Sequence, residues 1–332
     1  MRRRSFIVLL GTLMPLWAFA ATAERPQRVR RIGVLMRDSA PDSDVWVFRH
    51  AFLDAFQQRL QELGWIVGRN AEIDVRWAST DSLRVYSAEL VGLSPDVLVG
   101  TDTPITKALQ SATHNIPIVF VTLSDPVGTG LISNLSRPEC NLTGFTDYEY
   151  SMGGKWLELL KEISPDVTHV TFLFNPDTAP FAKHYIQSAQ DAAARLSVTL
   201  NAPGVRDTGT LERAIATLAS TPNGGLIVMP DVFNFIHTRL ITELAERLRV
   251  PAVYSLPFST ARGGLLSYST DYAELWRRAA TYVDRILHGA SPANLPVQQP
   301  NKFDLSINLK TAKAIGLVVP DSLLARADEV IE

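Results

Sequence analysis

The sequence predicts an α/β protein of two similar lobes, in which parallel sheets are flanked by helices. From Arg28 onward, short β-branched runs alternate with longer amphipathic runs, which is the pattern of parallel strands joined by crossover helices. The strand-like runs are apolar along their length, as expected where helices cover both faces of a sheet. The series of strands and helices occurs twice, so two lobes are expected.

The first series of elements lies between residues 31 and 145. Its expected strands are Arg31–Met36, Glu72–Trp77, Asp96–Gly100, Ile118–Leu123 and Leu142–Phe145. Its expected helices are Val45–Leu63, Ser82–Leu93 and Thr103–Thr113. Apolar residues recur at helical spacing in the first helix, which predicts one apolar face on it; they are Phe48, Phe52, Ala55, Phe56 and Leu60.

The second series begins with an expected helix at Met152–Ile163. The strands that follow are His169–Phe174, Val198–Asn201, Gly225–Met229 and Ala252–Tyr254, and the helices are Phe181–Arg195, Leu211–Ala219 and Phe233–Arg249. Four more elements are then expected: a strand at Leu265–Tyr268, a helix at Tyr272–His288, a strand at Phe303–Ile307 and a helix at Leu309–Ile315. We interpret these last elements as the chain crossing between the lobes more than once.

The expected division of the chain follows from these two series. The N-terminal lobe comprises residues 28–145 plus about 270–300, and the C-terminal lobe comprises 146–268 plus about 303–332. Several connections between two lobes restrict their relative motion to opening and closing about a hinge. Ligands bind beyond the carboxyl ends of strands in open parallel sheets, so two facing lobes are expected to enclose one ligand-binding cleft.

The first 23 residues have the pattern of a cleaved export signal. Arg2–Arg4 precede an apolar stretch at Phe6–Ala20, and Ala21–Ala23 supplies the small residues that a signal peptidase requires. The alternative is an uncleaved membrane anchor, but Thr12 and Pro15 interrupt a segment that is already short for a span of about 20 apolar residues. The mature protein is therefore expected in the periplasm.

Two export routes stay open from the sequence. The segment Arg3-Arg4-Ser5-Phe6-Ile7 resembles a twin-arginine signal, which directs export after folding, but triple arginines also occur in ordinary leaders. The single cysteine, Cys140, lies far from the leader, so no cysteine follows the apolar run to carry a lipid. A freely diffusing mature protein is expected.

Composition excludes several classes of function. Removal of three arginines with the leader changes the formal net charge from −2 to −5, which argues against a nucleic-acid partner. One cysteine permits no internal disulfide, so packed cores must stabilise the 309 residues of 24–332. No second apolar run of membrane length follows the leader, so a protein not embedded in the membrane is expected after cleavage.

The loop that is best suited to a ligand follows the third expected strand. Thr101-Asp102-Thr103-Pro104 opens a helix, with proline near the first turn. A helix N-terminus exposes unpaired N–H groups and a partial positive charge, so a ligand carboxylate could bind there together with the hydroxyl of Thr101 or Thr103. The alternative is that Asp102 or Thr103 only caps its own helix.

Further polar side chains follow other strands and are expected to converge on the same cleft. Asp231 is chosen as the partner of a ligand amino group. An aromatic ligand could stack on Trp46, Tyr148, Phe233 or Tyr254, although aromatic rings such as these are more often part of the core than in contact with a ligand. The residues predicted to bind the ligand are Ser39, Thr101, Thr103, Ser124, Asp125, Asn175, Asp231 and Tyr254.

Signals for catalysis, metals and cofactors are weak. The sequence contains no nucleophile elbow, no zinc-protease motif and no paired-cysteine spacing. Gly128-Thr129-Gly130 resembles a dinucleotide loop, but Ser133 stands where the third glycine belongs. The sequence therefore predicts a protein that is not an enzyme and that holds no metal and no cofactor.

Several segments resemble one known family along essentially the whole chain. They include Pro117–Val121 leading to Asp125–Gly128, and Asn141–Gly144; the strongest are Leu295–Pro300, Ile307–Ala314 and Leu323–Glu329. On these segments the chain resembles the ABC-transporter substrate-binding proteins, which include tryptophan/tyrosine-type binding proteins. The resemblance implies a type 1 periplasmic-binding fold, with two Rossmann-like lobes and a hinge of three crossings.

The resemblance also implies a function and partners. A member of this family captures a small molecule and delivers it to an inner-membrane ABC permease and its ATPase, a mechanism that needs only a monomer. Thr101, Thr103, Ser124, Asn175 and Asp231 match the strand-end positions that line the cleft in similar proteins. Asp102 departs from the glycine-rich loop of many members and opposes a ligand carboxylate, so an amino acid and other small polar or aromatic ligands stay open.

Two other classes of function remain as alternatives. A periplasmic receptor for a membrane sensor would have the same fold, and only its neighbouring genes or a pull-down would distinguish it. An exported α/β enzyme is disfavoured because no nucleophile and base occur at a recognisable spacing. A cytoplasmic repressor is excluded by the leader and by the lack of a helix-turn-helix segment before Arg31.

Overall fold

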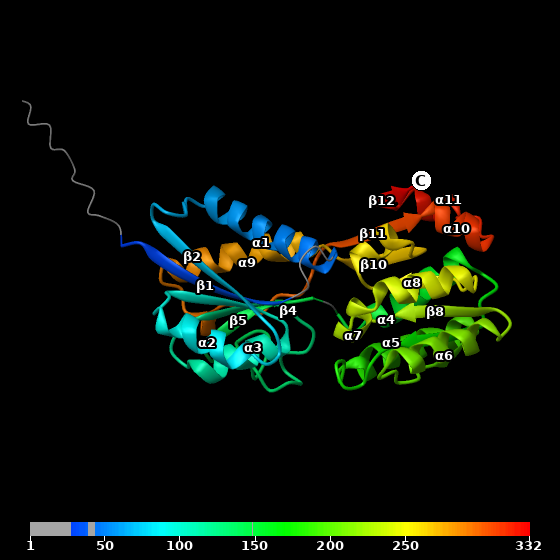
Figure 1. Ribbon diagram of the computed structural model, residues 1–332, viewed down its shortest axis with the longest axis horizontal. Helices are drawn as coiled ribbons and strands as arrows, with labels where there is room; N and C mark the ends of the chain where they lie inside the picture. Colours follow the sequence, from blue (N-terminus) through cyan, green and yellow to red (C-terminus); the bar gives the residue numbers. More distant parts are fainter. Residues whose placement is uncertain (1–27, 39–43, 148) are drawn as a thin grey trace, which may run out of the picture.

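The computed structural model describes residues 28–38, 44–147 and 149–332, and these form two α/β lobes side by side (Figure 1). The predicted two-lobed architecture is confirmed. The expected leader, residues 1–23, and the expected ligand contacts at Ser39 and Tyr148 lie outside the described residues.

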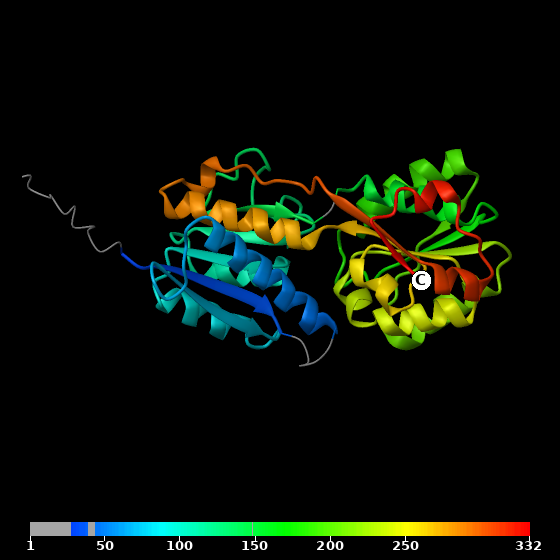
Figure 2. The same ribbon diagram turned by 90° about the horizontal axis from the view of Figure 1, so that it is seen from above.

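The first lobe is built on a parallel sheet of five strands in the order β2-β1-β3-β4-β5. The strands are β1 (Arg30–Arg37), β2 (Ala71–Ala78), β3 (Val97–Thr101), β4 (Ile118–Leu123) and β5 (Leu142–Thr146). One face packs on α1 (Asp44–Glu62) and α9 (Tyr272–Leu287), and the other on α2 (Leu83–Gly92) and α3 (Thr103–Ala112). Figure 2 shows α1 and α9 side by side along this sheet.

Side chains of β1 show why this sheet is buried on both faces. Ile32, Val34 and Met36 join the core beneath α1 and α9, whereas Leu35 joins the core beneath α2 and α3. Successive residues of a strand point to opposite faces, so an apolar run without alternation fits only a sheet covered twice.

The second lobe is built on a sheet of seven strands in the order β12-β11-β10-β9-β8-β6-β7. The strands are β6 (His169–Leu173), β7 (Thr199–Asn201), β8 (Gly224–Val228), β9 (Ala252–Tyr254), β10 (Leu266–Thr270), β11 (Phe303–Asn308) and β12 (Glu329–Ile331). Helices α4 (Met152–Ile163), α5 (Ala182–Leu196) and α10 (Leu309–Ile315) pack on one face, and α6 (Thr208–Ala219) and α8 (Thr238–Arg247) on the other. Short helices complete the described chain: α7 (Val232–Ile236), α11 (Asp321–Leu324) and the 3₁₀ turns η1 (Pro257–Arg262) and η2 (Pro292–Asn294).

The second sheet is not wholly parallel, in contrast to the prediction. Strands β10 and β11 pair antiparallel, with Leu266 opposite Ile307. The reason is the path of the chain: it leaves β10 for the first lobe, forms α9 there, and enters β11 on its return, so the two strands run in opposite directions.

The expected single helix at Phe233–Arg249 is wrong, because it is divided into α7 and α8 at His237. The buried side chain of Asn234 donates to Leu173 O at 2.8 Å and to Met229 O at 3.0 Å, which fixes α7 against the ends of β6 and β8. Helix α8 packs its own apolar face on the core, through Ile241 and its neighbours.

The chain passes between the two sheets three times in the described part of the molecule. It does so after β5, between β10 and α9, and between Pro300 and β11. Since β5 leads directly into the second lobe and β10 leads directly into the first, the carboxyl ends of both strands lie at the boundary between the lobes. Strands β1, β3 and β4 run parallel to β5, and β6, β8 and β9 run parallel to β10, so two sets of carboxyl ends face each other.

None of the helices in the described residues is both long enough and apolar enough to span a lipid bilayer.

Candidate functional site

The β3–α3 loop of the first lobe already contains a carboxylate at the helix N-terminus. Asp102 caps α3, and its Oδ1 accepts the Ile105 N–H at 3.0 Å. The guanidinium of Arg37, at the end of β1, donates to both carboxylate oxygens, at 3.0 and 3.2 Å. The capping alternative is therefore the observed one, and Asp102 occupies the position where a ligand carboxylate was expected.

The other two residues of this loop are partly exposed at the interlobe boundary. Thr103 is the first residue of α3. The hydroxyl oxygen of Thr101 is inaccessible to solvent and has no hydrogen-bond partner among the described residues. A buried hydroxyl without a partner costs free energy, and the described contacts of Thr101 do not offset that cost.

At the end of β4, the predicted residues contact the first crossing instead of open space. Ser124 Oγ donates to Asp147 Oδ2 at 3.3 Å. Asp125 accepts the Gly128 N–H at 2.8 Å and a hydrogen bond from Tyr150, whose pKa is raised by burial and by this carboxylate. Both residues therefore link the first lobe to the segment that leads into the second.

In the second lobe, the carboxylate of Asp231 connects two strand-end loops. It accepts the Asn175 N–H at 2.6 Å, the Phe233 N–H at 3.0 Å and the hydroxyl of Thr178. Burial raises the pKa of Asp231 above its usual value, although the three hydrogen bonds favour the charged form. Its acceptor sites are used within the lobe, and Asp231 is only 7% exposed, so these contacts do not favour the predicted pairing with a ligand amino group.

The structure brings Asn175 to Asp231, whereas the ring of Tyr254, at the end of β9, lies in the core of the second lobe. Asn175 is buried, and its side chain accepts the Asp177 N–H at 2.8 Å. Tyr254 is 1% exposed and packs in the core beneath α6 and α8. The alternative of plain core is the observed one for this ring, because its strand directs the side chain to that face of the sheet.

Direct contacts between the lobes come from residues that the sequence did not single out as functional. The ring centroid of Phe48 on α1 lies 4.8 Å from that of Phe258 on η1, which lies 5.0 Å from that of Phe235 on α7. The guanidinium of Arg49 stacks on Phe235 at 5.5 Å. We call Phe48, Arg49, Phe235 and Phe258 the aromatic–arginine junction.

Arg49 is anchored to the first lobe while it stacks on the second. Its Nη1 donates to Arg37 O at 2.6 Å and to Asp38 O at 2.9 Å. Burial lowers the pKa of Arg49 to about 10, so the side chain stays charged at neutral pH. Phe48 belongs to the expected apolar stripe of α1, and the stripe alone does not reveal that this end of it faces a second lobe.

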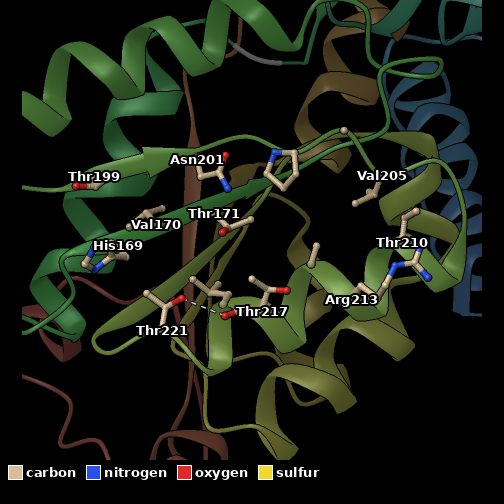
Figure 3. Close-up of a pocket in the computed structure, with 14 residues that line it drawn as sticks. His169, Val170, Thr171, Thr199, Asn201, Val205, Thr210, Arg213, Thr217 and Thr221 are labelled. Carbon is tan, nitrogen blue, oxygen red and sulfur yellow. Dashed lines mark hydrogen bonds between the residues drawn. The ribbon is translucent and has the colours of Figure 1, made fainter.

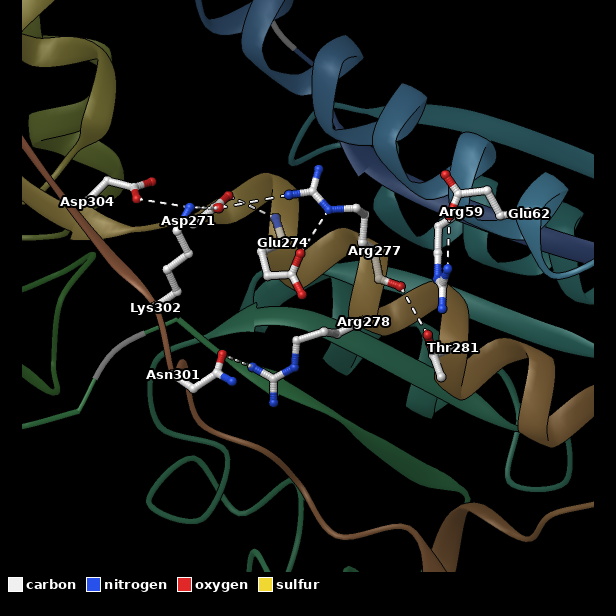
Figure 4. A network of polar contacts seen from close by, with 10 residues as sticks. All are labelled: Arg59, Glu62, Asp271, Glu274, Arg277, Arg278, Thr281, Asn301, Lys302 and Asp304. Carbon is white, nitrogen blue, oxygen red and sulfur yellow. Dashed lines mark hydrogen bonds and ion pairs between the residues drawn. The ribbon is translucent and has the colours of Figure 1, made fainter. Parts of the chain in front are cut away.

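An ion network connects the second and third crossings (Figure 4). The Nζ atom of Lys302 lies 2.8 Å from Asp271 Oδ2 and 3.3 Å from Asp304 Oδ1. Burial would raise the pKa of Asp271, but hydrogen bonds from Lys302 and from the Glu274 N–H outweigh it and hold this pKa below its usual value. The two crossings are therefore tied to each other beside the boundary.

No cluster of three His, Cys, Asp or Glu side chains that could hold a metal ion occurs in residues 28–38, 44–147 and 149–332. Two cavities, of about 400 and 640 Å³, are described in the second lobe. Their lining includes none of the predicted ligand-binding residues. The facing strand ends remain the candidate functional site.

Comparison with known proteins decides the family. The family described as ABC transporter substrate binding protein matches residues 49–331. The chain belongs to this family. The resemblance of the sequence segments is thereby confirmed.

Individual relatives resemble this substrate-binding protein in sequence or in fold. It is 26% identical over 272 residues to a tyrosine-binding protein of Clostridioides difficile, covering 79% of this chain and 75% of the relative. A solved structure of a conserved domain protein from Vibrio cholerae matches with a TM-score of 0.80 and 28% identity, over 91% of this chain and 100% of that one.

A second solved structure shares the fold at lower identity. The structure of an ABC domain in complex with L-tryptophan from Streptococcus pneumoniae has a TM-score of 0.80 and 24% identity, over 91% of this chain and 100% of that one. The substrate-binding protein thus has the two-lobed type 1 periplasmic-binding fold. One relative is named a tyrosine-binding protein and the family is one of substrate-binding proteins, which fits the expectation of a protein that is not an enzyme.

Proposed function

We propose that this protein is the periplasmic solute-binding component of an ABC importer, which captures a small molecule between its lobes and delivers it to a membrane permease and its ATPase. The observation that carries the proposal is the pair of facing strand-end sets, joined by three crossings, in a chain of the substrate-binding family. Residues 1–23 are proposed as the signal that exports it, by the general or the twin-arginine route.

The proposed ligand is an aromatic amino acid or a related aromatic compound. Support comes from the relative that is named a tyrosine-binding protein and from the similar structure that contains L-tryptophan. Thr101 is proposed to contact the ligand, because its hydroxyl lies at a facing strand end without a partner in the described part of the chain. Asp102 opposes a carboxylate at the α3 N-terminus, so the ligand is expected to place any carboxylate elsewhere.

Capture requires that the ligand binds the closed arrangement of the lobes better than the open one, since equal affinity for both would not shift the equilibrium between them. A ligand at 100 times its Kd stabilises the folded protein by about 2.7 kcal/mol. Thermal unfolding is therefore measured with tryptophan, tyrosine, other amino acids and aromatic acids. A hit is expected to raise the melting temperature and to reduce the radius of gyration in X-ray scattering.

Two controls separate this proposal from its alternatives. The ligand is recovered after incubation and identified by mass spectrometry, and chemical turnover would indicate an enzyme. A pull-down from membranes with the closed, ligand-bound protein is expected to retain a permease, whereas retention of a sensor instead would indicate a receptor. A screen in which no compound changes either melting temperature or scattering would count against solute binding.

A further inference from the structure

The second lobe contains a cavity of about 400 Å³ on the flank of its sheet, between the β6–β7 pair and α6 (Figure 3). Its walls come from β6, β7, the segment that follows β7, and α6. The volume lies within the range of small-molecule sites, roughly 300–1,000 Å³. The lining therefore decides what the cavity could hold.

The cavity exists because the sheet extends beyond the helix that should cover it. Strand β7 is the last strand of the sheet and has only three residues, Thr199–Asn201. Helix α6 packs on the neighbouring strands, with Leu211, Ile215 and Leu218 in the core. The flank between α6 and the β6–β7 pair is left open.

Thr171 lies at the centre of this cavity in a place where an apolar side chain would be expected. Its neighbours Val170 and Phe172 point into the core beneath α4 and α5, so Thr171 points to the opposite face, toward α6. Thr171 is 6% exposed, and no hydrogen bond is recorded for its hydroxyl among the described residues. Its hydroxyl oxygen is not among the solvent-inaccessible oxygens that lack a partner, so it stays accessible from the cavity and can bond a ligand there.

The remaining lining combines hydroxyls with positive charge. Among the described residues that line the cavity are Thr199 and Thr217, the amide of Asn201, and Arg213, but no Asp or Glu. Arg213 also interacts electrostatically with Asp207, whose carboxylate accepts the Thr210 N–H at the start of α6. The lining also includes apolar residues, among them Val205, Ala214 and Leu218.

We propose that this cavity is a second ligand site, which binds a small polyhydroxylated molecule with one anionic group. Threonine hydroxyls both donate and accept, and so match the hydroxyls of a polyol. The guanidinium of Arg213 matches a carboxylate or a phosphate. Thr171 contributes a hydroxyl at the centre. The proposal is independent of solute capture between the lobes.

The test uses gluconate as the probe and follows the backbone amide signals of the full protein by NMR. Saturable shifts are expected at residues of β6, β7 and α6. Arg213→Gln is expected to weaken gluconate binding by roughly tenfold, the loss of one charge-assisted hydrogen bond. Thr171→Val is expected to weaken binding while the melting temperature stays the same or rises, which a merely structural role would not produce.

The matched control is Arg247→Gln, which removes a charge from the exposed surface of α8 and is expected to leave binding unchanged. Glucitol, which lacks the carboxylate, and acetate, which lacks the hydroxyls, should each bind more weakly than gluconate. The proposal is overturned if gluconate produces no saturable shifts in this region, if acetate binds there as tightly, or if both variants bind gluconate as the natural protein does.

Discussion

Two neighbouring strand ends of the first lobe contain residues with backbone angles that L residues rarely adopt. Asp102, after β3, has φ 36° and ψ 167°, and Thr122, near the end of β4, has φ 64°. Thr122 coincides with a shift in the pairing of β4 and β5. Such conformations cost about 1–3 kcal/mol each, and they persist where surrounding contacts enforce them. Both lie at ends that face the second lobe, which supports this boundary as the functional site.

The charge of Asp102 is expected to weaken the binding of ligands that carry a carboxylate. The substitution Asp102→Gly removes the carboxylate to which the Ile105 N–H and the guanidinium of Arg37 donate, so both donors become available to a ligand carboxylate. Glycine adopts the positive φ of this position without strain. The affinity for L-tyrosine, measured by calorimetry, should increase by about 1 kcal/mol, or about fivefold. Asp166→Gly removes the same charge from an exposed loop before β6 and should have no effect. Unchanged or weaker binding by Asp102→Gly would contradict the prediction.

At the scale of the elements, close approach of helices sets the shape of the second lobe. Helices α4 and α5 cross at Gly153, where an added Cβ would lie 2.0 Å from the carbonyl oxygen of Tyr185. Both partners of this contact are backbone or fixed to it, so neither can move independently. The contact therefore determines how far α4 lies from the rest of the core.

Adjacent glycines of α4 provide a matched pair of substitutions. Gly153→Ala is expected to destabilise the protein by about 1–3 kcal/mol, because the methyl group forces the helices apart. At Gly154 the nearest atom to an added Cβ is the Ser188 oxygen at 3.3 Å, so Gly154→Ala should change the stability by no more than about 1 kcal/mol. Denaturant unfolding measures both. Equal effects of the two substitutions would refute the close-contact explanation.

The ion network at the crossings gives the stability of the protein a pH dependence. Because the pKa of Asp271 in the folded state lies below its unfolded value of about 3.9, its contribution is complete above that pH and is lost as the pH falls through the folded-state pKa. Lys302→Met removes the main partner, so the variant should be less stable by about 0.5–1 kcal/mol at neutral pH. The difference should vanish in acid.

Unfolding by denaturant over a series of pH values checks this prediction. Lys310→Met on α10 is the control, because Lys310 is exposed and no ion pair is recorded for it among the described residues. Its effect should be small and independent of pH. If the deficit of Lys302→Met stayed constant down to acid pH, Asp271 would not be the group responsible.

At the scale of the whole molecule, the aromatic–arginine junction connects the lobes near the N-terminal end of α1, on the same apolar stripe that packs on α9 farther along the helix. Arg49 is held by carbonyl oxygens of the first lobe and stacks on a ring of the second. Aromatic pairs contribute about 0.5–1.5 kcal/mol and cation–π contacts about 0.5–2 kcal/mol. A contact of this size is enough to shift an equilibrium between open and closed lobes without preventing it.

Removal of one junction ring should therefore favour the open arrangement. Phe235→Ala loses the contacts with both Phe258 and Arg49, about 2 kcal/mol in total, and is expected to increase the radius of gyration in X-ray scattering without ligand. Ile236→Ala, on the same helix, is the control because Ile236 is 66% exposed. A radius that is the same in all three proteins would show that the junction does not hold the lobes together.

The sequence by itself determined the fold class and nearly all of the elements. Local periodicity suffices for this, because a strand covered on both faces and an amphipathic helix each leave a pattern within a few residues. It did not reveal β12, whose three residues are largely exposed at the edge of the sheet and leave no such pattern. It also predicted one helix over Phe233–Arg249, where the structure has the two helices α7 and α8. The side chain of Asn234 on α7 donates to carbonyl oxygens at the ends of β6 and β8, and no local pattern shows these contacts.

Only the tertiary structure decided how the strand-end residues are used. The sequence pattern places Asp102, Asp125 and Asp231 in loops that suit a ligand. In the structure, their carboxylates accept hydrogen bonds from groups in distant parts of the chain, namely Arg37, Tyr150 and Asn175. The antiparallel direction of β11 and the contact of Phe48 with the second lobe likewise depend on where the chain returns between the lobes. Such contacts join residues far apart in sequence, and no local pattern contains them.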